Sequence, residues 1–267
     1  SWNKVIMVNT DSFFYSLKQS GVDLFTGVPD SLLKNICAFI TDNTSPENHI
    51  IAANEGNAIS IGIGYHLATK KTPLIYLQNS GLGNIINPLL SLVDPDVYSI
   101  PMILLIGWRG EPGVADEPQH IKQGRITTGL LDVMKIPYEI LSSETSSEES
   151  DQIVKRMVKQ ASTLNAPCAL LVKKGTFSSY KLKLDNYYER DLYREQVIEI
   201  IINEISSDDI VVSTTGVASR ELFEYRSKKS QSHEKDFLTV GGMGHASQIA
   251  LGISLFKKNR TVYCIDG

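Results

Sequence analysis

The 267-residue sequence has no long hydrophobic run, and its first ten residues lack the apolar core of a signal peptide. A membrane-spanning helix needs a stretch of about 18 or more apolar residues. The formal net charge is −4, so the basic excess of a nucleic-acid-binding protein is also missing. These absences predict a cytoplasmic protein that binds neither a membrane nor nucleic acid.

Cysteine is scarce, and the three cysteines lie far apart in apolar stretches, at Cys37, Cys168 and Cys264. Disulfide frameworks and cysteine metal sites need patterned, closely spaced cysteines. We therefore expect buried thiols in a reducing compartment. The composition, 42% hydrophobic and 21% charged, fits one large or two ordinary globular domains, and no short repeat is present.

Short apolar runs alternate with amphipathic segments over the first 180 residues. The strand-like runs are 22–29, 50–53, 73–78, 100–108, 136–141 and 168–174. Helical spacing of apolar residues appears between them, for example in 30–40 and 149–164. Continuous apolar strands that alternate with helices predict a doubly wound parallel α/β sheet.

A polar, aperiodic stretch, 181–191, predicts a linker between a first domain, 1–180, and a second domain, 192–267. The second domain has three helix patterns and three strand patterns, namely 192–205, 218–228, 245–258, and 209–216, 237–244, 261–267. Three strands bury little apolar surface. We therefore expect this chain to hold only the first part of the second domain.

Several strands are predicted to end in polar, glycine-rich turns. These read "GVPDS" (27–31), "NEGNA" (54–58), "QNSGLGN" (78–84), "GWRGEPG" (107–113), "STTG" (213–216) and "GGMGHAS" (241–247). Ligands of open α/β sheets bind at the carboxyl ends of the strands. Each turn also has a simple structural explanation: Asp30 suits a helix N-cap, and "SGLGN" and "GGMG" suit tight bends. A dinucleotide site is disfavoured because "GLGN" lacks the third glycine of the fingerprint, and there is no P-loop lysine motif.

In this order, and together with "DEPQH" (116–120) and a terminal "IDG", the turns resemble motifs of the thiamine-diphosphate-dependent 2-oxo acid decarboxylases. Among these, the phosphonopyruvate decarboxylases are the most similar, followed by the sulfopyruvate decarboxylases. The resemblance implies two α/β domains of the thiamine-diphosphate-binding type, one for the pyrimidine and one for the diphosphate. It also implies Mg²⁺ and decarboxylation of 3-phosphonopyruvate to phosphonoacetaldehyde and CO₂. Sulfopyruvate as the substrate and a non-catalytic α/β binding module remain alternatives.

Glu55 lies where an apolar strand pattern changes into a helix of small residues, with no Lys or Arg nearby in sequence. An acid in the first turn of a helix is favoured by the helix dipole, so a structural role is possible. The resemblance implies a catalytic and cofactor-binding role, in which the carboxyl group hydrogen-bonds to the cofactor's pyrimidine nitrogen. An apolar pocket without a competing cation suits that task.

The resemblance also implies roles for other motif residues. Expected cofactor contacts are Asn79, Thr214, Thr215, Gly216, Gly242, Met243, Gly244 and His245. Expected substrate contacts are Asp30, Asn79, Ser80, Arg109 and His120, with Asp30 and His120 also moving protons and Lys122 and Arg125 as further candidate cations. The alternatives are a core position for Met243, a helix cap for His245, a surface loop for His120 and a solvated cation for Lys122. The ligands of Mg²⁺ are expected beyond Gly267, and Asp266 is not expected to be one.

The helix pattern 57–68 contains small residues on all sides. Such residues let helices approach closely, either inside a domain or across an interface. Since the resembling family builds its site between two subunits, we expect a homodimer or a higher homo-oligomer.

Overall fold

The structure is a computed structural model that describes residues 6–183 and 191–266. The chain divides into two compact units, Ser1–Asp185 (unit 1) and Asn186–Gly267 (unit 2). Most of the predicted linker, 181–191, lies outside the described residues.

Unit 1 is built on a six-stranded sheet in the order β2-β1-β3-β4-β6-β5, with every neighbouring pair parallel. Each of the six strand-like runs of the sequence contains or overlaps one strand. The strands are β1 (Phe25–Gly27), β2 (His49–Ile51), β3 (Leu74–Gln78), β4 (Met102–Gly107), β5 (Tyr138–Leu141) and β6 (Pro167–Val172). The predicted parallel α/β fold is confirmed for this part of the chain.

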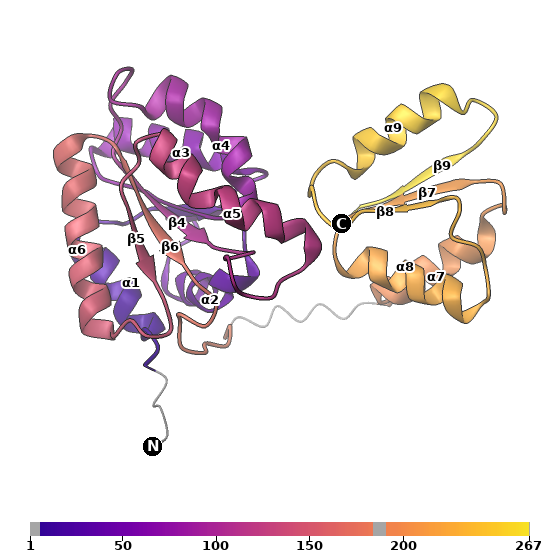
Figure 1. The fold of residues 1–267 in the computed structure, drawn as a ribbon, viewed down its shortest axis with the longest axis horizontal. Helices are drawn as coiled ribbons and strands as arrows, with labels where there is room; N and C mark the ends of the chain where they lie inside the picture. Colours follow the sequence, from indigo (N-terminus) through magenta and orange to yellow (C-terminus); the bar gives the residue numbers. More distant parts are fainter. Residues whose placement is uncertain (1–5, 184–190, 267) are drawn as a thin grey trace. The chain divides into compact units, whose positions relative to one another are not determined.

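Helices cover both faces of this sheet (Figure 1). One apolar core joins the sheet to α1 (Thr10–Gln19), α2 (Lys34–Asn43) and α6 (Ser147–Leu164). The other core joins it to α3 (Glu55–Thr69), α4 (Leu82–Pro88), η3 (Leu89–Val93) and α5 (Pro118–Val133). Two single-turn helices, η1 (Ser31–Leu33) and η2 (Asn79–Gly81), follow β1 and β3.

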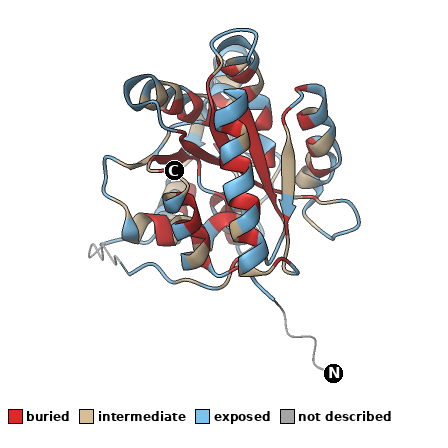
Figure 2. Ribbon diagram, turned by 90° about the vertical axis from the view of Figure 1, so that its left-hand side faces the viewer, coloured by how far each residue is buried: buried red, intermediate tan, exposed pale blue. Residues whose placement is uncertain are grey.

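The central strands are buried on both faces, and the helices expose their outer sides (Figure 2). In β3, Leu74 and Tyr76 enter one core, while Ile75 and Leu77 enter the other. A strand with two buried faces gains from apolar side chains at every position. This is why the strands read as continuous apolar runs in the sequence.

Unit 2 has a three-stranded parallel sheet in the order β8-β7-β9, which confirms a second, smaller α/β sheet. Its elements are α7 (Arg194–Glu204), β7 (Ile210–Ser213), α8 (Val217–Lys228), β8 (Asp236–Leu238), α9 (Ala246–Phe256) and β9 (Val262–Ile265). Side chains of α7 and α8 share one core with β7, and those of α9 share another. β8 ends at Leu238, earlier than the predicted run 237–244, and the end of that run cannot be a strand because Gly242 and Gly244 have positive φ angles of 69° and 88°.

Within the two described ranges, every helix is too short or too polar to cross a bilayer.

Candidate active site

The carboxyl ends of β1, β3 and β4 are neighbours in the sheet of unit 1. Asp30 follows β1, Gln78 ends β3, and Arg109 follows β4 by two residues. Gln78 is in register with Gly107, the last residue of β4. The predicted turns after these strands therefore lie at one edge of the sheet, where α/β proteins bind ligands.

Asp30 is buried at this edge and is held from two directions. One carboxylate oxygen accepts a bond of 3.1 Å from the backbone N–H of Leu32, so the N-cap role is present at the start of η1. The other oxygen accepts a bond of 2.7 Å from the side-chain amide of Gln78. A Cβ on Gly107 would come within 2.0 Å of this carboxylate, so glycine is required there for its approach.

Glu55 begins α3, as the sequence predicts, and only 9% of it is exposed. One carboxylate oxygen accepts a bond of 2.7 Å from Asn84 Nδ2. A Cβ on Gly81 would lie 2.4 Å from the other oxygen, so the "SGLGN" glycine makes room for the acid. Among the described residues, no ion pair involves Glu55. The acid is therefore enclosed without a cationic partner in this part of the chain.

Asn79 is 1% exposed, and its side chain holds two other segments together. Its Nδ2 donates to the carbonyl oxygen of Arg109 at 2.8 Å and to Thr127 Oγ1 at 2.9 Å. Its Oδ1 accepts from the backbone N–H of Arg109 at 3.0 Å. Ser80, the next residue, is exposed, and its hydroxyl donates to Gln78 Oε1 at 2.6 Å. Asn79 thus joins the turn after β4 to α5.

Arg109 forms a bidentate ion pair with Asp116. Its Nε and one terminal nitrogen donate at 2.8 and 2.5 Å, and the other terminal nitrogen donates to Ser31 Oγ at 2.9 Å. Asp116 also accepts from the backbone N–H groups of Gly110 and Glu117, each at 2.8 Å. The Arg109 hydrogen bonds hold the pKa of Asp116 well below its usual range. The guanidinium charge is therefore already partly neutralised.

His120 lies in the first helical turn of α5, so the alternative of a surface-loop histidine is wrong. Its ring is half-buried, and its Nδ1 is a buried atom without a hydrogen-bond partner. Burial, followed by the nearby Arg109 charge, lowers the pKa of His120, which favours the neutral ring at pH 7. The α5 backbone at His120 lies close to Gly110. A Cβ added to Gly110 would be 1.9 Å from the His120 carbonyl oxygen.

The two other candidate cations of α5, Lys122 and Arg125, are exposed. Neither forms an ion pair with a described residue. This is the behaviour of solvated cations, although it leaves both available to a charged ligand.

The predicted diphosphate motifs of unit 2 also follow the carboxyl ends of adjacent strands. Thr214 is buried after β7, and its backbone N–H donates to the Ile265 carbonyl at 2.8 Å. Thr215 is half-buried, and Gly216, with φ of 93°, precedes the first turn of α8. The free N–H groups of a helix start favour an anion.

The loop 239–245 follows β8, next to β7 in the sheet. Met243 is 62% exposed, so the alternative that it fills a core gap is wrong. His245 occupies the N-cap position of α9 without a side-chain capping bond. Its Nδ1 lies 3.0 Å from the carbonyl oxygen of Gly242, which makes the ring part of the loop.

Sequence reasoning missed four side chains that organise unit 1: Gln78, Asn84, Asp116 and Thr127. Gln78, Asn84 and Asp116 lie inside the quoted motifs "QNSGLGN" and "DEPQH", and their polar character was the available signal. No sequence signal pairs Gln78 with Asp30, because the two are 48 residues apart.

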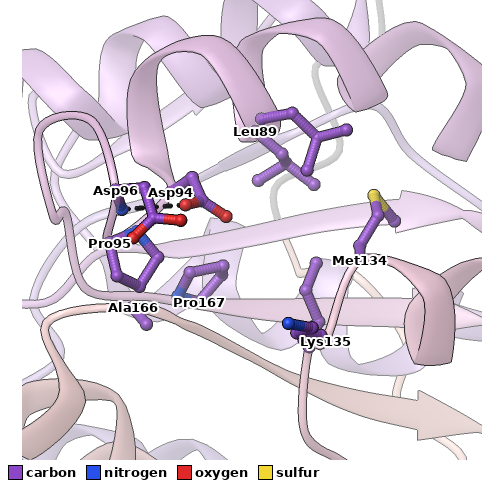
Figure 3. A pocket seen from close by; sticks show the side chains of 10 residues that line it. Leu89, Asp94, Pro95, Asp96, Met134, Lys135, Ala166 and Pro167 are labelled. Carbon is purple, nitrogen blue, oxygen red and sulfur yellow. Dashed lines mark hydrogen bonds between the residues drawn. The ribbon is translucent and has the colours of Figure 1, made fainter.

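A separate pocket of about 250 Å³ lies at the amino ends of the strands (Figure 3). Pro167 at the start of β6, Lys135 before β5, and Asp94 after η3 contribute to its wall. None of the predicted site residues lines this pocket. A second pocket, of about 420 Å³, has Asp30 in its wall.

Comparison with known proteins gives a family. Residues 7–132 match the model of the thiamine pyrophosphate enzyme N-terminal TPP binding domain. A phosphonopyruvate decarboxylase of Streptomyces viridochromogenes is 30% identical over 98% of this chain and 66% of its own length. The chain thus spans a little less than two thirds of that relative.

Two subunits of an archaeal enzyme match separately. The sulfopyruvate decarboxylase subunit alpha of Methanococcus maripaludis is 32% identical over 61% of this chain and 93% of its own length. The subunit beta of the same organism is 39% identical over 29% of this chain and 38% of its own length. With these matches, the chain belongs to the thiamine-pyrophosphate-dependent 2-oxo acid decarboxylase family.

Proposed function

We propose that the protein decarboxylates 3-phosphonopyruvate, giving phosphonoacetaldehyde and CO₂, with thiamine diphosphate and Mg²⁺. The observation that carries the proposal is the enclosed Glu55 carboxylate, which rests against Gly81 and meets no cation among the described residues. The similarity to phosphonopyruvate decarboxylases over 98% of the chain supports this substrate. Sulfopyruvate remains the second candidate, because sulfopyruvate decarboxylase subunits match at similar identity.

The residues of unit 1 suit the pyrimidine half of the cofactor. The Glu55 carboxyl group would hold a proton at the pyrimidine ring nitrogen, and its buried position would favour that exchange over exchange with water. When bound, thiamine diphosphate supplies a nucleophilic carbon and an acceptor for the electrons left by CO₂. Asn84, which donates to Glu55 at 2.7 Å, would keep the carboxylate oriented.

The residues of unit 2 suit the diphosphate half. Thr214, Thr215 and Gly216 would offer hydroxyl and backbone donors at the start of α8, and the exposed Met243 would contact the cofactor rings. Gly242 and Gly244, with positive φ, allow the loop to bend around a ligand, and His245 would lie beside it. The described residues contain no group of three His, Cys, Asp or Glu side chains suited to a metal, so we assign no step to Mg²⁺ here.

Asp30 and His120 would handle protons at the reacting carbon of the substrate. His120 offers a neutral ring with an unpartnered Nδ1 as a proton acceptor, and Asp30 is fixed by Gln78. Asn79 would hold the turn that carries Arg109 in place, Ser80 would contact the substrate, and Arg109 would add positive charge beside it.

We further propose that the active site forms between two copies of this chain, so the protein would be a homodimer or a multiple of one. The archaeal relative is made of subunits named alpha and beta, which supports association between subunits. Three small residues on exposed positions of α3 (Ser60, Gly64 and Ala68) would allow a close approach.

The decisive experiment is Glu55→Gln in the complete protein. The amide keeps the size and the Asn84 contact but cannot exchange a proton, so we expect turnover of phosphonopyruvate to fall by about 100-fold or more. Steady-state assays with phosphonopyruvate, sulfopyruvate and pyruvate would measure it, and circular dichroism would confirm the fold. Near-normal activity in this variant, or no activity of the wild type on any of the three acids, would refute the proposal.

A further inference from the structure

The substrate of the proposed reaction carries two anionic groups, the carboxylate that leaves as CO₂ and a phosphonate or sulfonate tail. A tail of this kind needs a cation that no protein carboxylate already holds. At the carboxyl edge of unit 1, Arg109 is paired with Asp116, and Lys173 is paired with Glu111. Lys173 also lies 5.8 Å from the centre of the Trp108 ring. These two cations therefore have protein partners, whereas Lys122 and Arg125 have no ion pair with a described residue but line neither of the two pockets.

Lys34 differs from these cations. It is the first residue of α2, four positions after Asp30, and it is exposed. Within the described ranges, no ion pair and no hydrogen bond of its ammonium group is present. Its charge is therefore available at the edge of the sheet that carries Asp30.

Lys34 also lines the pocket of about 420 Å³ that has Asp30 in its wall. Clefts that bind small ligands measure about 300 to 1,000 Å³, so the pocket can take a three-carbon acid with its tail. Asp30, Ser31 and Lys34 gather charged and hydroxyl groups in the wall. The remaining lining is mostly apolar or uncharged, and comes from Pro29, Cys37, Ala38, Thr41, His49, Ile51, Tyr76 and Leu182.

The titratable side chains of this lining add no competing positive charge. Burial raises the pKa of the Cys37 thiol to about 12 and lowers the pKa of His49, so both stay neutral at pH 7. His49 Nε2 is 2.9 Å from the Tyr76 hydroxyl, so this nitrogen of the imidazole already has a hydrogen-bond partner. Lys34 is thus the cationic side chain in the lining of this pocket. Ser31, which also lines it, accepts the hydrogen bond from Arg109.

We infer that Lys34 receives the anionic tail of the 2-oxo acid in the pocket beside Asp30, and that it sets the preference for acids with a phosphonate or sulfonate tail. This inference rests on the proposed decarboxylase function. A lysine ammonium acts as a compact charge without a fixed hydrogen-bonding plane. It therefore selects for the charge of the tail, while Asp30 stays near the reacting carbon.

The test is Lys34→Gln in the complete protein with thiamine diphosphate and Mg²⁺. Loss of a charge-assisted contact corresponds to a rise of about 10- to 100-fold in KM for phosphonopyruvate. The KM for pyruvate, which has no charged tail, should change less than about threefold, and kcat should change little for either acid. Lys159→Gln is the matched control, because Lys159 is an exposed lysine of α6 without an ion pair in the described residues.

A binding measurement separates this inference from the proposed reaction. Calorimetry on the cofactor-free protein with 3-phosphonopropionate and 3-sulfopropionate, two unreactive acids, should show affinity in the wild type and in Lys159→Gln. In Lys34→Gln both affinities should fall by about tenfold or more. If only the phosphonate analogue binds, the phosphonate is the recognised tail; if only the sulfonate analogue binds, it is the sulfonate.

Equal changes in KM for phosphonopyruvate and pyruvate would overturn the role of Lys34, and so would unchanged binding of both analogues. In either case a wild type that decarboxylates phosphonopyruvate or sulfopyruvate would leave the proposed function standing. A wild type that turns over none of the acids would instead refute the proposed function.

Discussion

Asn79 and Arg109 each form two or more side-chain hydrogen bonds with other segments of unit 1, and Asp30 accepts one from Gln78 and one from Leu32 in its own turn. Glu55, in contrast, accepts one such bond, from Asn84, and is buried. A side chain whose hydrogen-bonding groups are fully used fixes its neighbours, whereas a buried carboxylate with remaining capacity can accept a further group. At the residue scale, this difference separates Asn79 as a positioning residue from Glu55 as a ligand-binding one.

The ion pair with Arg109 links the charge of Asp116 to the stability of the fold. Its folded-state pKa lies below the value of about 3.9 expected in the unfolded chain, because Arg109 donates two hydrogen bonds to it. A lowered carboxyl pKa stabilises the fold above the unfolded value, and this contribution is lost as the pH falls through the folded one. The stabilisation should therefore be full at pH 7.

We expect Asp116→Asn to lower the free energy of unfolding of unit 1 by about 1.5–3 kcal/mol at pH 7, since hydrogen bonds to a charged group contribute that much. Below about pH 4, the difference from the wild type should shrink. Urea unfolding followed by the fluorescence of the buried Trp108 would measure this at both pH values. A difference that stays constant with pH would contradict the assigned pKa direction.

At the scale of elements, the backbone of α5 packs closely against the turn after β4. A Cβ on Gly124 would lie 1.7 Å from the Gly110 carbonyl oxygen, and the Trp108 indole donates to the Gly124 carbonyl at 2.9 Å. Both contacts involve backbone atoms, which cannot move aside without shifting the turn. The position of Arg109 and His120 therefore depends on a helix that has no side chain at Gly124.

Gly124→Ala tests this dependence, with Gly129→Ala as the matched control in the same helix. We expect Gly124→Ala to destabilise unit 1 by about 1–3 kcal/mol through overpacking and to reduce turnover. A Cβ on Gly129 meets nothing within 4 Å, so that variant should be stabilised by about 0.5–1 kcal/mol. Thermal unfolding and turnover of both variants would give the comparison. Equal effects of the two substitutions would mean that the backbone contact is unimportant.

The strands were more predictable from the sequence than α5 or the loop of unit 2. β4 is buried on both faces, so its apolar run is nearly unbroken and marks it clearly. α5 contains two glycines and few buried residues, and its helix depends on packing against the turn after β4. The apolar run that includes β8 continues to Val240, but the strand ends at Leu238 before the glycines of the loop.

The candidate site was predictable as a region but not as a set of contacts. The rule that parallel strands end at the same edge places Asp30 near Arg109 without any coordinates. The hydrogen-bond partners within the region were not predictable in this way. The bond from Asn79 to Thr127, for example, joins side chains 48 residues apart. Which amide meets which acceptor depends on packing distances that a pattern along the chain does not contain.

At the scale of the whole molecule, the two groups of predicted cofactor residues lie on different compact units. Glu55 belongs to unit 1, whereas Met243 and Gly244 belong to unit 2. Among the small residues of α3, Ala58 and Gly62 are buried inside unit 1, so ordinary helix–sheet packing accounts for them. Ser60, Gly64 and Ala68 are exposed and stay available for contact with a second copy.

Mixed oligomers test the proposed assembly. Subunits with Glu55→Gln and subunits with Met243→Ala and Gly244→Ala should each be inactive alone. Together they should regain up to about a quarter of the wild-type activity, because one hybrid site receives both intact halves. Native mass spectrometry would establish that mixed oligomers form. Mixed oligomers that form and stay inactive would place the whole site within one chain.

The strand order of unit 1 affects how the chain folds during its synthesis. Among the described residues of unit 1, β5 pairs with β6 alone, and β6 lies between β4 and β5, although it is the last of the six strands to be made. As ribosomes add about 5–20 residues per second, the stretch from Leu141 to Val172 takes on the order of a few seconds to appear. During that interval the nascent sheet has an open β4 edge and an unpaired β5. Such edges can pair with other chains, so the growing chain is open to wrong strand pairing until β6 has been made.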